Sequence, residues 1–513
     1  MHVLFRCILA LAGGVVLSTG FAPVGFAPAL PIGVAALVLS VRGTRARSAW
    51  LPAWLFGLAF FAALLWWLRA VGSDAWAALS VVQSVYFIPL GLLLSAVSRL
   101  RWWPWWCACA WVSIETLRGA WPFGGLTWGR LSFATVDTAW ASGLPWFGMT
   151  GVSLLIALTG STVAWAVATR LRRPVVAVVA ATALGALTWL PVAAPYDVSG
   201  GRSLAVAAVQ ADVPGDGTDV LAHHREITRA FADATVDLAD AGEPVDLVVW
   251  SENSTAVDPF TDAEARGEIT RASAAIDEPI LVGGMVDSSR PKEILNQGIV
   301  WQPGLGGGDR YTKRHPVPYG EYIPYRGSLI PDTYGQLALI PRDMARGTSL
   351  EPLRVAGALV ADAICFDVSY DDAIHGQVAN GGQLVTVQTS NAMFINTAQI
   401  DQQFEISRLR AIETGRYVVV AAINGVSGII APDGEVVESA DPRTRAVVRG
   451  DVVLHDDLTP AVVLGPWTGR VVVGLTLGSI AFITLTYRRR RRHNALRPVA
   501  HDRVIEPSAT AHT

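Results

Sequence analysis

Cysteine is scarce in this sequence, and its few positions are uneven. Only four cysteines occur among 513 residues, and Cys7, Cys107 and Cys109 lie within long apolar stretches. Cys365 is the one thiol in the polar part of the chain. That part therefore cannot form an internal disulfide, and its stability depends on an ordinary hydrophobic core.

An excess of charge of one sign is also lacking. The formal net charge is -3 at pH 7, and the isoelectric point is about 6.3. A chain without an overall basic surface is not expected to have nucleic acid as its main partner. No group of His, Cys and Asp has the spacing of metal ligands, so the sequence predicts neither a metal site nor another cofactor.

Hydrophobic residues, in contrast, are abundant. They make up 51% of the chain, and most of the excess lies before Val198 and after Thr459. A transmembrane helix needs about 20 mostly apolar residues. Seven stretches before the polar part and one after it predict such helices, although the second is short and Pro104 interrupts the fifth: 3–20, 29–41, 49–69, 75–97, 102–118, 146–169, 174–194 and 460–486.

The arginines favour one orientation of these helices, because cytoplasmic loops are rich in Lys and Arg. They cluster in alternate loops and after the last apolar stretch: Arg42, Arg45 and Arg47; Arg99 and Arg101; Arg170, Arg172 and Arg173; and Arg488 to Arg492. The pattern predicts cytoplasmic termini and an extracytoplasmic polar domain. The final basic block could instead bind anionic lipid or nucleic acid, but a stop-transfer anchor is the simpler interpretation.

This topology divides the chain into four parts. We expect a membrane domain over residues 1–199, an extracytoplasmic domain over 200–458, a C-terminal transmembrane helix over 459–487 and a basic cytoplasmic tail over 488–513. The end of that tail is polar, with Pro and Ala, and is typical of a disordered segment.

The polar domain alternates short β-rich runs with polar helical stretches. Strands are predicted over 203–213, 246–252, 279–286, 297–301, 356–366, 383–389, 417–424 and 426–431. Helices are predicted over 219–241, 262–276, 371–380 and 399–414. Strands that are apolar throughout indicate sheets covered on both faces, so an α/β layered sandwich is the expected architecture.

Three residues at or beyond strand ends could carry out chemistry together: Glu252, Lys313 and Cys365. Each alone is more simply explained as structural. A nucleophilic cysteine, however, needs a base that takes its proton, and an acyl-transfer transition state needs a donor for its oxyanion. Glu252 can meet the first need and Lys313 the second.

Longer motifs surround these residues. They are Tyr311-x-Lys313-x-His315-x-Val317-Pro318-Tyr319-Gly320-Glu321-Tyr322-Ile323-Pro324; Arg408-Leu409-Arg410-Ala411-Ile412-Glu413-Thr414-Gly415-Arg416-Tyr417; Asn424-Gly425-x-Ser427; Pro432-Asp433-Gly434; and, in the membrane region, Glu115-Thr116-Leu117-Arg118-Gly119 leading into Trp121 to Trp128. This ordered set resembles the nitrilase superfamily and, within it, the apolipoprotein N-acyltransferases.

The resemblance implies a four-layer α-β-β-α sandwich on a polytopic helical membrane domain. It also implies that Glu252 is the general base, Lys313 the cation on the oxyanion side and Cys365 the nucleophile. Glu321 would be a second carboxylate that holds Lys313 or the amine substrate, or else the structural partner of an arginine.

Other residues are less specific. Asn296 and Asn391 match family positions near the site, but hydrogen bonding at a turn or strand end explains them equally well. His315 is expected to be packed beside the site. The resemblance is imperfect in three places: Phe366-Asp367 stands where the family usually has Tyr-Glu, Ser251 where Pro is common, and Asp and Trp are lacking after Asn391.

The activity that the resemblance implies is a two-step acyl transfer in a bacterial plasma membrane. A phospholipid would acylate Cys365, and the N-terminal amine of a diacylglyceryl-modified apolipoprotein would then accept the acyl group. The alternatives are a membrane-tethered amidase of the same superfamily and a scaffold that has lost catalysis.

Overall fold

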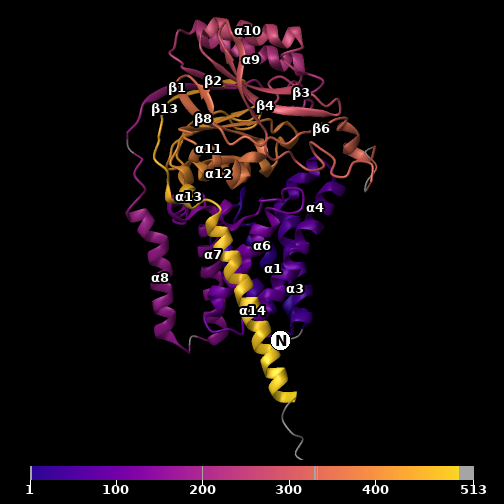
Figure 1. The fold of residues 1–513 in the computed structure, drawn as a ribbon, viewed down its shortest axis with the longest axis vertical. Coiled ribbons are helices and arrows are strands. Elements are labelled where there is room, and N and C mark those ends of the chain that lie inside the picture. Colours follow the sequence, from indigo (N-terminus) through magenta and orange to yellow (C-terminus); the bar gives the residue numbers. More distant parts are fainter. Residues whose placement is uncertain (1–2, 171, 199, 329–330, 332, 496–513) are drawn as a thin grey trace, which may run out of the picture.

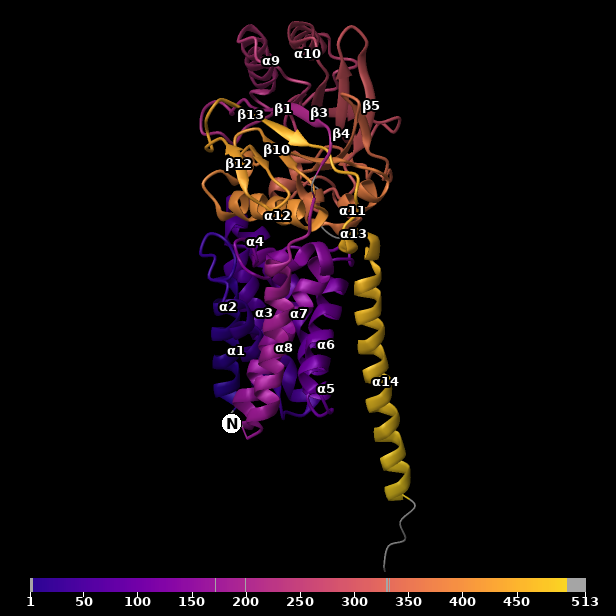
Figure 2. The same ribbon diagram turned by 90° about the vertical axis from the view of Figure 1, so that its left-hand side faces the viewer.

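The computed structural model describes residues 3–170, 172–198, 200–328, 331 and 333–495. A bundle of apolar helices lies beneath a layered α/β domain, and the C-terminal helix α14 returns beside the bundle (Figure 1). The view turned by 90° shows the same two-part arrangement (Figure 2). Residues 496–513, most of the predicted tail, lie outside the described residues.

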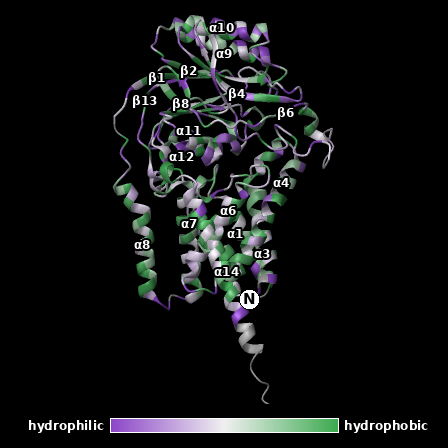
Figure 3. Ribbon diagram, in the orientation of Figure 1, coloured by the Kyte–Doolittle hydropathy of each residue, from purple (hydrophilic) through white to green (hydrophobic). Residues whose placement is uncertain are grey.

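Each predicted apolar stretch contains helix. The helices of this part are α1 (Val3–Ser18), α2 (Ala29–Val41), α3 (Ala46–Leu64), α4 (Ser73–Val85), α5 (Phe87–Val97), α6 (Trp103–Arg118), α7 (Leu144–Thr169), α8 (Pro174–Ala193) and α14 (Trp467–Ala495). Five segments of the described chain are long and apolar enough to cross a membrane: Arg47–Leu64, Ser73–Val97, Ala141–Thr169, Pro174–Ala193 and Trp467–Arg489. Hydrophobic residues dominate α8 and the bundle, whereas α9 and α10 are mixed (Figure 3).

Proline and glycine explain how three of the predicted helices fold. The stretch 75–97 is two helices, α4 and α5, because Pro89 has no N–H to donate to the carbonyl of Val85. Pro104 lies in the first turn of α6 rather than interrupting it, a position at which no N–H is needed. Gly148 bends α7 with a φ of 65°, which glycine adopts without strain.

The α/β domain contains two sheets packed face to face. The first has the order β13-β1-β2-β3-β4-β5, with β6 beside β4, and the second has the order β12-β11-β10-β9-β8-β7. The strands of the first sheet are β1 (Ser203–Gln210), β2 (Leu247–Val249), β3 (Ile280–Asp287), β4 (Glu293–Gln302), β5 (Gly306–Thr312), β6 (Asp343–Met344) and β13 (Ala446–Val453). Those of the second are β7 (Leu353–Val355), β8 (Ala358–Ile364), β9 (Leu384–Thr389), β10 (Val418–Ala422), β11 (Gly428–Ile430) and β12 (Val436–Ser439).

Helices cover both outer faces, which confirms the predicted four-layer sandwich. The first sheet is covered by α9 (His224–Asp240) and α10 (Ala263–Ile276), and the second by α11 (Asp371–Ala379) and α12 (Ala398–Thr414), which face the membrane bundle (Figure 1). The sequence did not predict β5, β6, β7, β12 or β13. The glycines at 306–308 have little β propensity, so the pattern of β5 is weak.

The α/β domain is anchored to the bundle by packing and by buried charge. A hydrophobic core that includes Phe61 in α3 and Trp128 in the loop after α6 continues to Leu409 in α12. Arg410 Nη1 lies 2.5 Å from Glu413 Oε2, and the second Glu413 oxygen accepts the Met149 N–H at the bend of α7 at 2.8 Å. The motif that contains Arg410 and Glu413 therefore fixes α12 onto the membrane helices.

Candidate active site

The three predicted catalytic residues lie just beyond three strands. Glu252 follows β2, Lys313 follows β5, and Cys365 follows β8. The Lys313 ammonium is fully buried and lies 3.0 Å from Glu252 Oε1. The charges of Glu252 and Lys313 both act on the Cys365 thiol. Two different sheets thus bring the three side chains to one place.

The Glu252 carboxylate is held on both oxygens. Asn296 Nδ2, from β4, donates to Oε1 at 2.7 Å, and the backbone N–H of Ser390 donates to Oε2 at 3.0 Å. Donors of this kind fix the orientation of a buried carboxylate and satisfy its lone pairs. The predicted position of Asn296 beside the site agrees with this contact, whereas Ser390 contributes only backbone and could not be recognised from its side chain.

Glu321 is paired with Lys313 rather than with an arginine. Its Oε1 lies 2.6 Å from Lys313 Nζ, and its Oε2 accepts the Val317 N–H at 2.8 Å. Burial opposes the charge on Lys313, but the carboxylates of Glu252 and Glu321 outweigh it and raise the pKa of Lys313 well above its usual range. Burial raises the pKa of Glu321, although Lys313 counteracts this effect. One cation therefore pairs with two carboxylates, that of the buried Glu252 and that of the half-buried Glu321.

Cys365 has a strained backbone and a protonated thiol. Its φ is +52°, a region that costs energy for residues other than glycine and that persists where surrounding structure enforces it. Burial, together with the charge of Glu252, raises the pKa of the Cys365 thiol to about 12. The raised pKa favours the protonated thiol, so a base is needed wherever Cys365 acts as a nucleophile.

Asp367 connects the Cys365 turn with the Lys313 turn. Its fully buried carboxylate accepts the Tyr311 hydroxyl at 2.9 Å and the Arg314 N–H at 3.2 Å on Oδ2, and the His315 N–H at 2.8 Å on Oδ1. The sequence marked Asp367 only as a departure from the family pattern. Its role depends on contacts between two sheets, which the local pattern does not contain.

Replacing Asp367 with Ala is expected to destabilise the fold and misplace Lys313. The change leaves the Tyr311 hydroxyl and three backbone N–H groups, those of Arg314, His315 and Ile364, without this acceptor. Each buried donor left unpaired costs about 1–3 kcal/mol. Thermal unfolding in detergent should move several degrees lower for Asp367→Ala, whereas Glu438→Ala, at an exposed carboxylate, should match the parent. An unchanged midpoint for Asp367→Ala would contradict this role.

Aromatic residues join the site to the membrane domain. Phe366, next to Cys365, stacks on Trp128 with ring centroids 6.1 Å apart. The Tyr370 hydroxyl donates to the carbonyl of Gly125 at 2.8 Å. Arg118 Nη1 holds this loop by donating to the carbonyls of Leu126 and Trp128 at 2.7 and 2.6 Å. The membrane-region motif thus shapes the loop that contacts the site.

His315 and Asn391 lie at the edge of the arrangement. The His315 ring stacks on Tyr370 at 3.8 Å, and its Nε2 lies 2.9 Å from an Asp372 carboxylate oxygen. The Asn391 amide donates to Gln403 at 2.6 Å and to Gln399 at 3.0 Å, both in α12. Asn391 therefore positions the segment that carries Ser390, and its side chain contacts α12 rather than Glu252.

A buried acid lies in β8, the strand that ends just before Cys365. Asp362 in β8 accepts the Thr386 hydroxyl at 2.7 Å on Oδ1, and burial raises the pKa of Asp362 to about 7. Within the described residues, Asp362 Oδ2 and Gln388 Oε1 are both buried without a hydrogen-bond partner, and both lie against Gly298. A proton on Asp362 supplies the donor that this pair of acceptors requires.

The stability of the protein should therefore depend on the protonation of Asp362. Because the folded-state pKa is raised above the ordinary value of 3.8, the contribution is complete below about pH 4 and is lost as the pH rises to about 7. The full effect is on the order of 4 kcal/mol. Asp362→Asn should remove this component from the pH dependence of thermal unfolding, and identical profiles for the two proteins would contradict it.

Two family models match the chain. Residues 205–456 match the model described as "Carbon-nitrogen hydrolase", and residues 13–162 match "Apolipoprotein N-acyltransferase N-terminal domain". The layered fold and the first match define a nitrilase-superfamily domain, here joined to apolar helices. Among the described residues, no group of three His, Cys, Asp or Glu side chains is arranged to hold a metal ion.

Curated relatives specify the family. An apolipoprotein N-acyltransferase of Mycolicibacterium smegmatis is 35% identical over 510 residues, covering 92% of this chain and 84% of the relative. An apolipoprotein N-acyltransferase of Pseudomonas putida is 29% identical over 500 residues, covering 92% of this chain and 95% of the relative. The chain belongs to the apolipoprotein N-acyltransferase family. A solved nitrilase-superfamily structure, Saccharomyces cerevisiae Nit3, aligns with 50% of this chain and 92% of its own at 14% identity and a TM-score of 0.38.

Proposed function

We propose that this protein transfers a fatty acyl group from a membrane phospholipid to the N-terminal amine of a diacylglyceryl-modified apolipoprotein. The observation that carries the proposal is the position of Cys365: it lies beside a buried Glu252–Lys313 pair, and its neighbour Phe366 packs on Trp128 of the membrane domain. A nucleophile at this junction is placed for substrates that stay in the bilayer. The family to which the chain belongs supports the same activity.

In the first step, the Cys365 sulfur attacks the ester carbonyl of the phospholipid while Glu252 takes the thiol proton. The raised thiol pKa makes general-base assistance by Glu252 favourable at this step. Collapse of the tetrahedral intermediate forms the thioester and breaks the ester C–O bond. Glu252 returns the proton to the leaving alkoxide, which departs as lysophospholipid.

Lys313 would stabilise the oxyanion in both steps. An ammonium has three N–H donors, and Glu252 and Glu321 accept two of them. The third is available to the oxyanion, a contact worth about 2.7–4 kcal/mol where donors are preorganised. In the second step, the acceptor amine attacks the thioester, Glu252 takes its proton, and the proton returns to the departing Cys365 thiolate.

The arginine-rich loops support cytoplasmic termini and an extracytoplasmic catalytic domain. Two of these loops lie close together: Arg99 donates to the carbonyl of Thr44 at 2.9 Å, and Arg6 of α1 donates to that of Arg42 at 3.0 Å. They lie at the end of the bundle that carries the N-terminus, away from the α/β domain (Figure 1). The link between α7 and α8 lies at the same end (Figure 2). Positive charge at this end favours the cytoplasmic side.

Product analysis tests the activity. Purified protein in vesicles is supplied with acyl-labelled phospholipid and a diacylglyceryl-cysteine lipopeptide that has a free amine. N-acylated lipopeptide and lysophospholipid in equal amounts are the expected products. Labelled free fatty acid alone would identify a hydrolase, and no product with any donor would favour a scaffold that has lost catalysis.

A further inference from the structure

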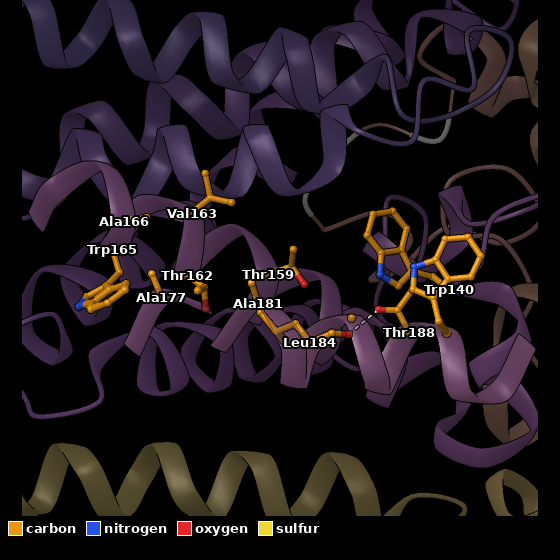
Figure 4. A pocket seen from close by; sticks show the side chains of 12 residues that line it. Trp140, Thr159, Thr162, Val163, Trp165, Ala166, Ala177, Ala181, Leu184 and Thr188 are labelled. Atoms are coloured by element: carbon orange, nitrogen blue, oxygen red, sulfur yellow. Dashed lines mark hydrogen bonds between the residues drawn. The ribbon is translucent and has the colours of Figure 1, made fainter. Parts of the chain in front are cut away.

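Two oxygen atoms meet without a hydrogen-bond donor between the sheets of the α/β domain. Asp362 Oδ2 and Gln388 Oε1 are buried, and neither has a partner among the described residues. A Cβ placed at Gly298 would lie 2.1 Å from the first and 2.6 Å from the second, so both lie over the same glycine. The hollow between α7 and α8, in contrast, is lined mostly by apolar side chains (Figure 4). The interior of the sandwich, rather than this hollow, presents polar atoms that the triad does not use.

The nitrogen of the Gln388 amide fixes the orientation of that amide. Gln388 Nε2 donates to the Trp250 carbonyl at 2.6 Å and to the Leu281 carbonyl at 3.3 Å. Turning the amide over would place its oxygen against these two carbonyl oxygens. Gln388 Oε1 therefore faces Asp362, and two acceptors that face each other require a proton on one of them. A carboxylic acid carries such a proton, so Asp362 is neutral in this arrangement.

The groups around Asp362 favour its neutral form. Burial is the main reason that the pKa of Asp362 is raised to about 7, and the charge of Asp367 adds to this effect, while the Thr386 hydroxyl opposes it. Tyr311 of β5 is the other titratable neighbour, and its hydroxyl donates to Asp367. Gln377 of α11 contacts only the backbone of Asp362 and is uncharged. Within the described part of the chain, no cation acts on Asp362 to favour its ionised form.

The acid and the amide join the strands that end at the base and at the nucleophile. Asp362 lies in β8, which leads into the nucleophile. Gln388 lies in β9, which leads into Ser390, and the Ser390 N–H donates to Glu252. Trp250, whose carbonyl accepts from Gln388, lies at the end of β2 just before Glu252. One hydrogen-bonded bridge therefore connects three strand ends at the reacting groups.

We propose that neutral Asp362 is a positioning residue for acyl transfer: its O–H donates to Gln388, and this bridge holds Glu252 in place at Cys365. Ionisation removes the donor and places a negative charge against the Gln388 oxygen, so the bridge opens and the base loses its support. The inference rests on the proposed roles of Glu252 and Cys365. Because the proposed location of the domain is extracytoplasmic, acyl transfer should respond to the pH outside the membrane.

The pH dependence of thioester formation tests the bridge. Parent protein and variants in vesicles receive labelled phospholipid, at a temperature where each stays folded from about pH 6 to about pH 9. The parent rate should fall about tenfold for each pH unit above the Asp362 pKa, because only the acid fraction reacts. Asp362→Asn should lack this fall, since the Asn amide donates in place of the acid O–H at every pH. Asp309→Asn, at an exposed carboxylate of β5, should follow the parent.

Asp362→Leu separates the bridge from the charge. Leucine is neutral at every pH but has no donor for Gln388, so this variant should react at least about tenfold more slowly than Asp362→Asn at the same pH. Equal rates for the two variants would mean that only the absence of charge matters, and the bridge would be refuted.

Infrared spectroscopy provides a readout that does not depend on catalysis. The difference spectrum between the parent and Asp362→Asn should show a carboxylic acid carbonyl band at low pH that gives way to carboxylate bands as the pH rises. A parent that shows this titration but forms no thioester at any pH would contradict the proposed function and leave the neutral acid established. No acid band at low pH, or the same fall in rate for Asp362→Asn as for the parent, would overturn the inference.

Discussion

Cys365→Ala is expected to abolish N-acylation, lowering turnover by at least about 10⁴-fold, because loss of a nucleophile removes the covalent step entirely. The fold should survive, since a half-buried thiol gives way to a smaller side chain. The measurement is the rate of N-acylated lipopeptide formation in vesicles with labelled phospholipid.

Cys7→Ala provides the matched control. Cys7 is also half-buried, but it lies in α1, far along the chain from the site. This variant should retain full activity. If Cys365→Ala turned over at the parent rate, Cys365 would not be the nucleophile, whatever the activity of the control.

Lys313→Met should damage both stability and activity. Removing the ammonium leaves the buried Glu252 carboxylate beside the half-buried Glu321 carboxylate without a cation, and breaking a buried ion pair costs about 3–5 kcal/mol. Loss of the oxyanion donor should lower turnover by about 10²- to 10³-fold. Thermal unfolding and single-turnover kinetics measure the two effects separately.

A double variant separates the two roles of Lys313. Adding Glu321→Gln to Lys313→Met removes one of the two facing carboxylates, so much of the stability should return. Activity should not return, because no cation faces the oxyanion. Recovery of both together would mean that Lys313 acts only by holding the fold.

The architecture was predictable because its signals are long and repeated. Apolar stretches and alternating strand and helix patterns indicated the helical bundle and the layered domain, and the structure confirms both. The predicted and observed elements differ where the local pattern is weak. The glycines of β5 have little β propensity, so this strand was not predicted. Pro89 divides an apolar stretch that was predicted to be one helix.

The candidate site was predictable only in part. The family resemblance placed Glu252, Lys313, Glu321 and Asn296 at or near one site, and hydrogen bonds connect them in the structure. The contacts of Asp367 and Phe366 could not be predicted, because each depends on segments far away in sequence. The resemblance placed Asn391 near the site, but it did not predict that the Asn391 side chain contacts α12. Packing between the layers of the fold determines such contacts, and short sequence patterns do not predict that packing.

The proposed mechanism rests on an acyl group carried by Cys365, and trapping it is the most direct test. Protein is incubated with phospholipid of defined acyl chain and no acceptor, quenched in acid and digested for mass spectrometry. We predict one acyl mass on the peptide that contains Cys365, labile to hydroxylamine and lost when acceptor lipopeptide is added before quenching. Formation of N-acylated product at the normal rate without any acyl adduct at Cys365 would contradict the account.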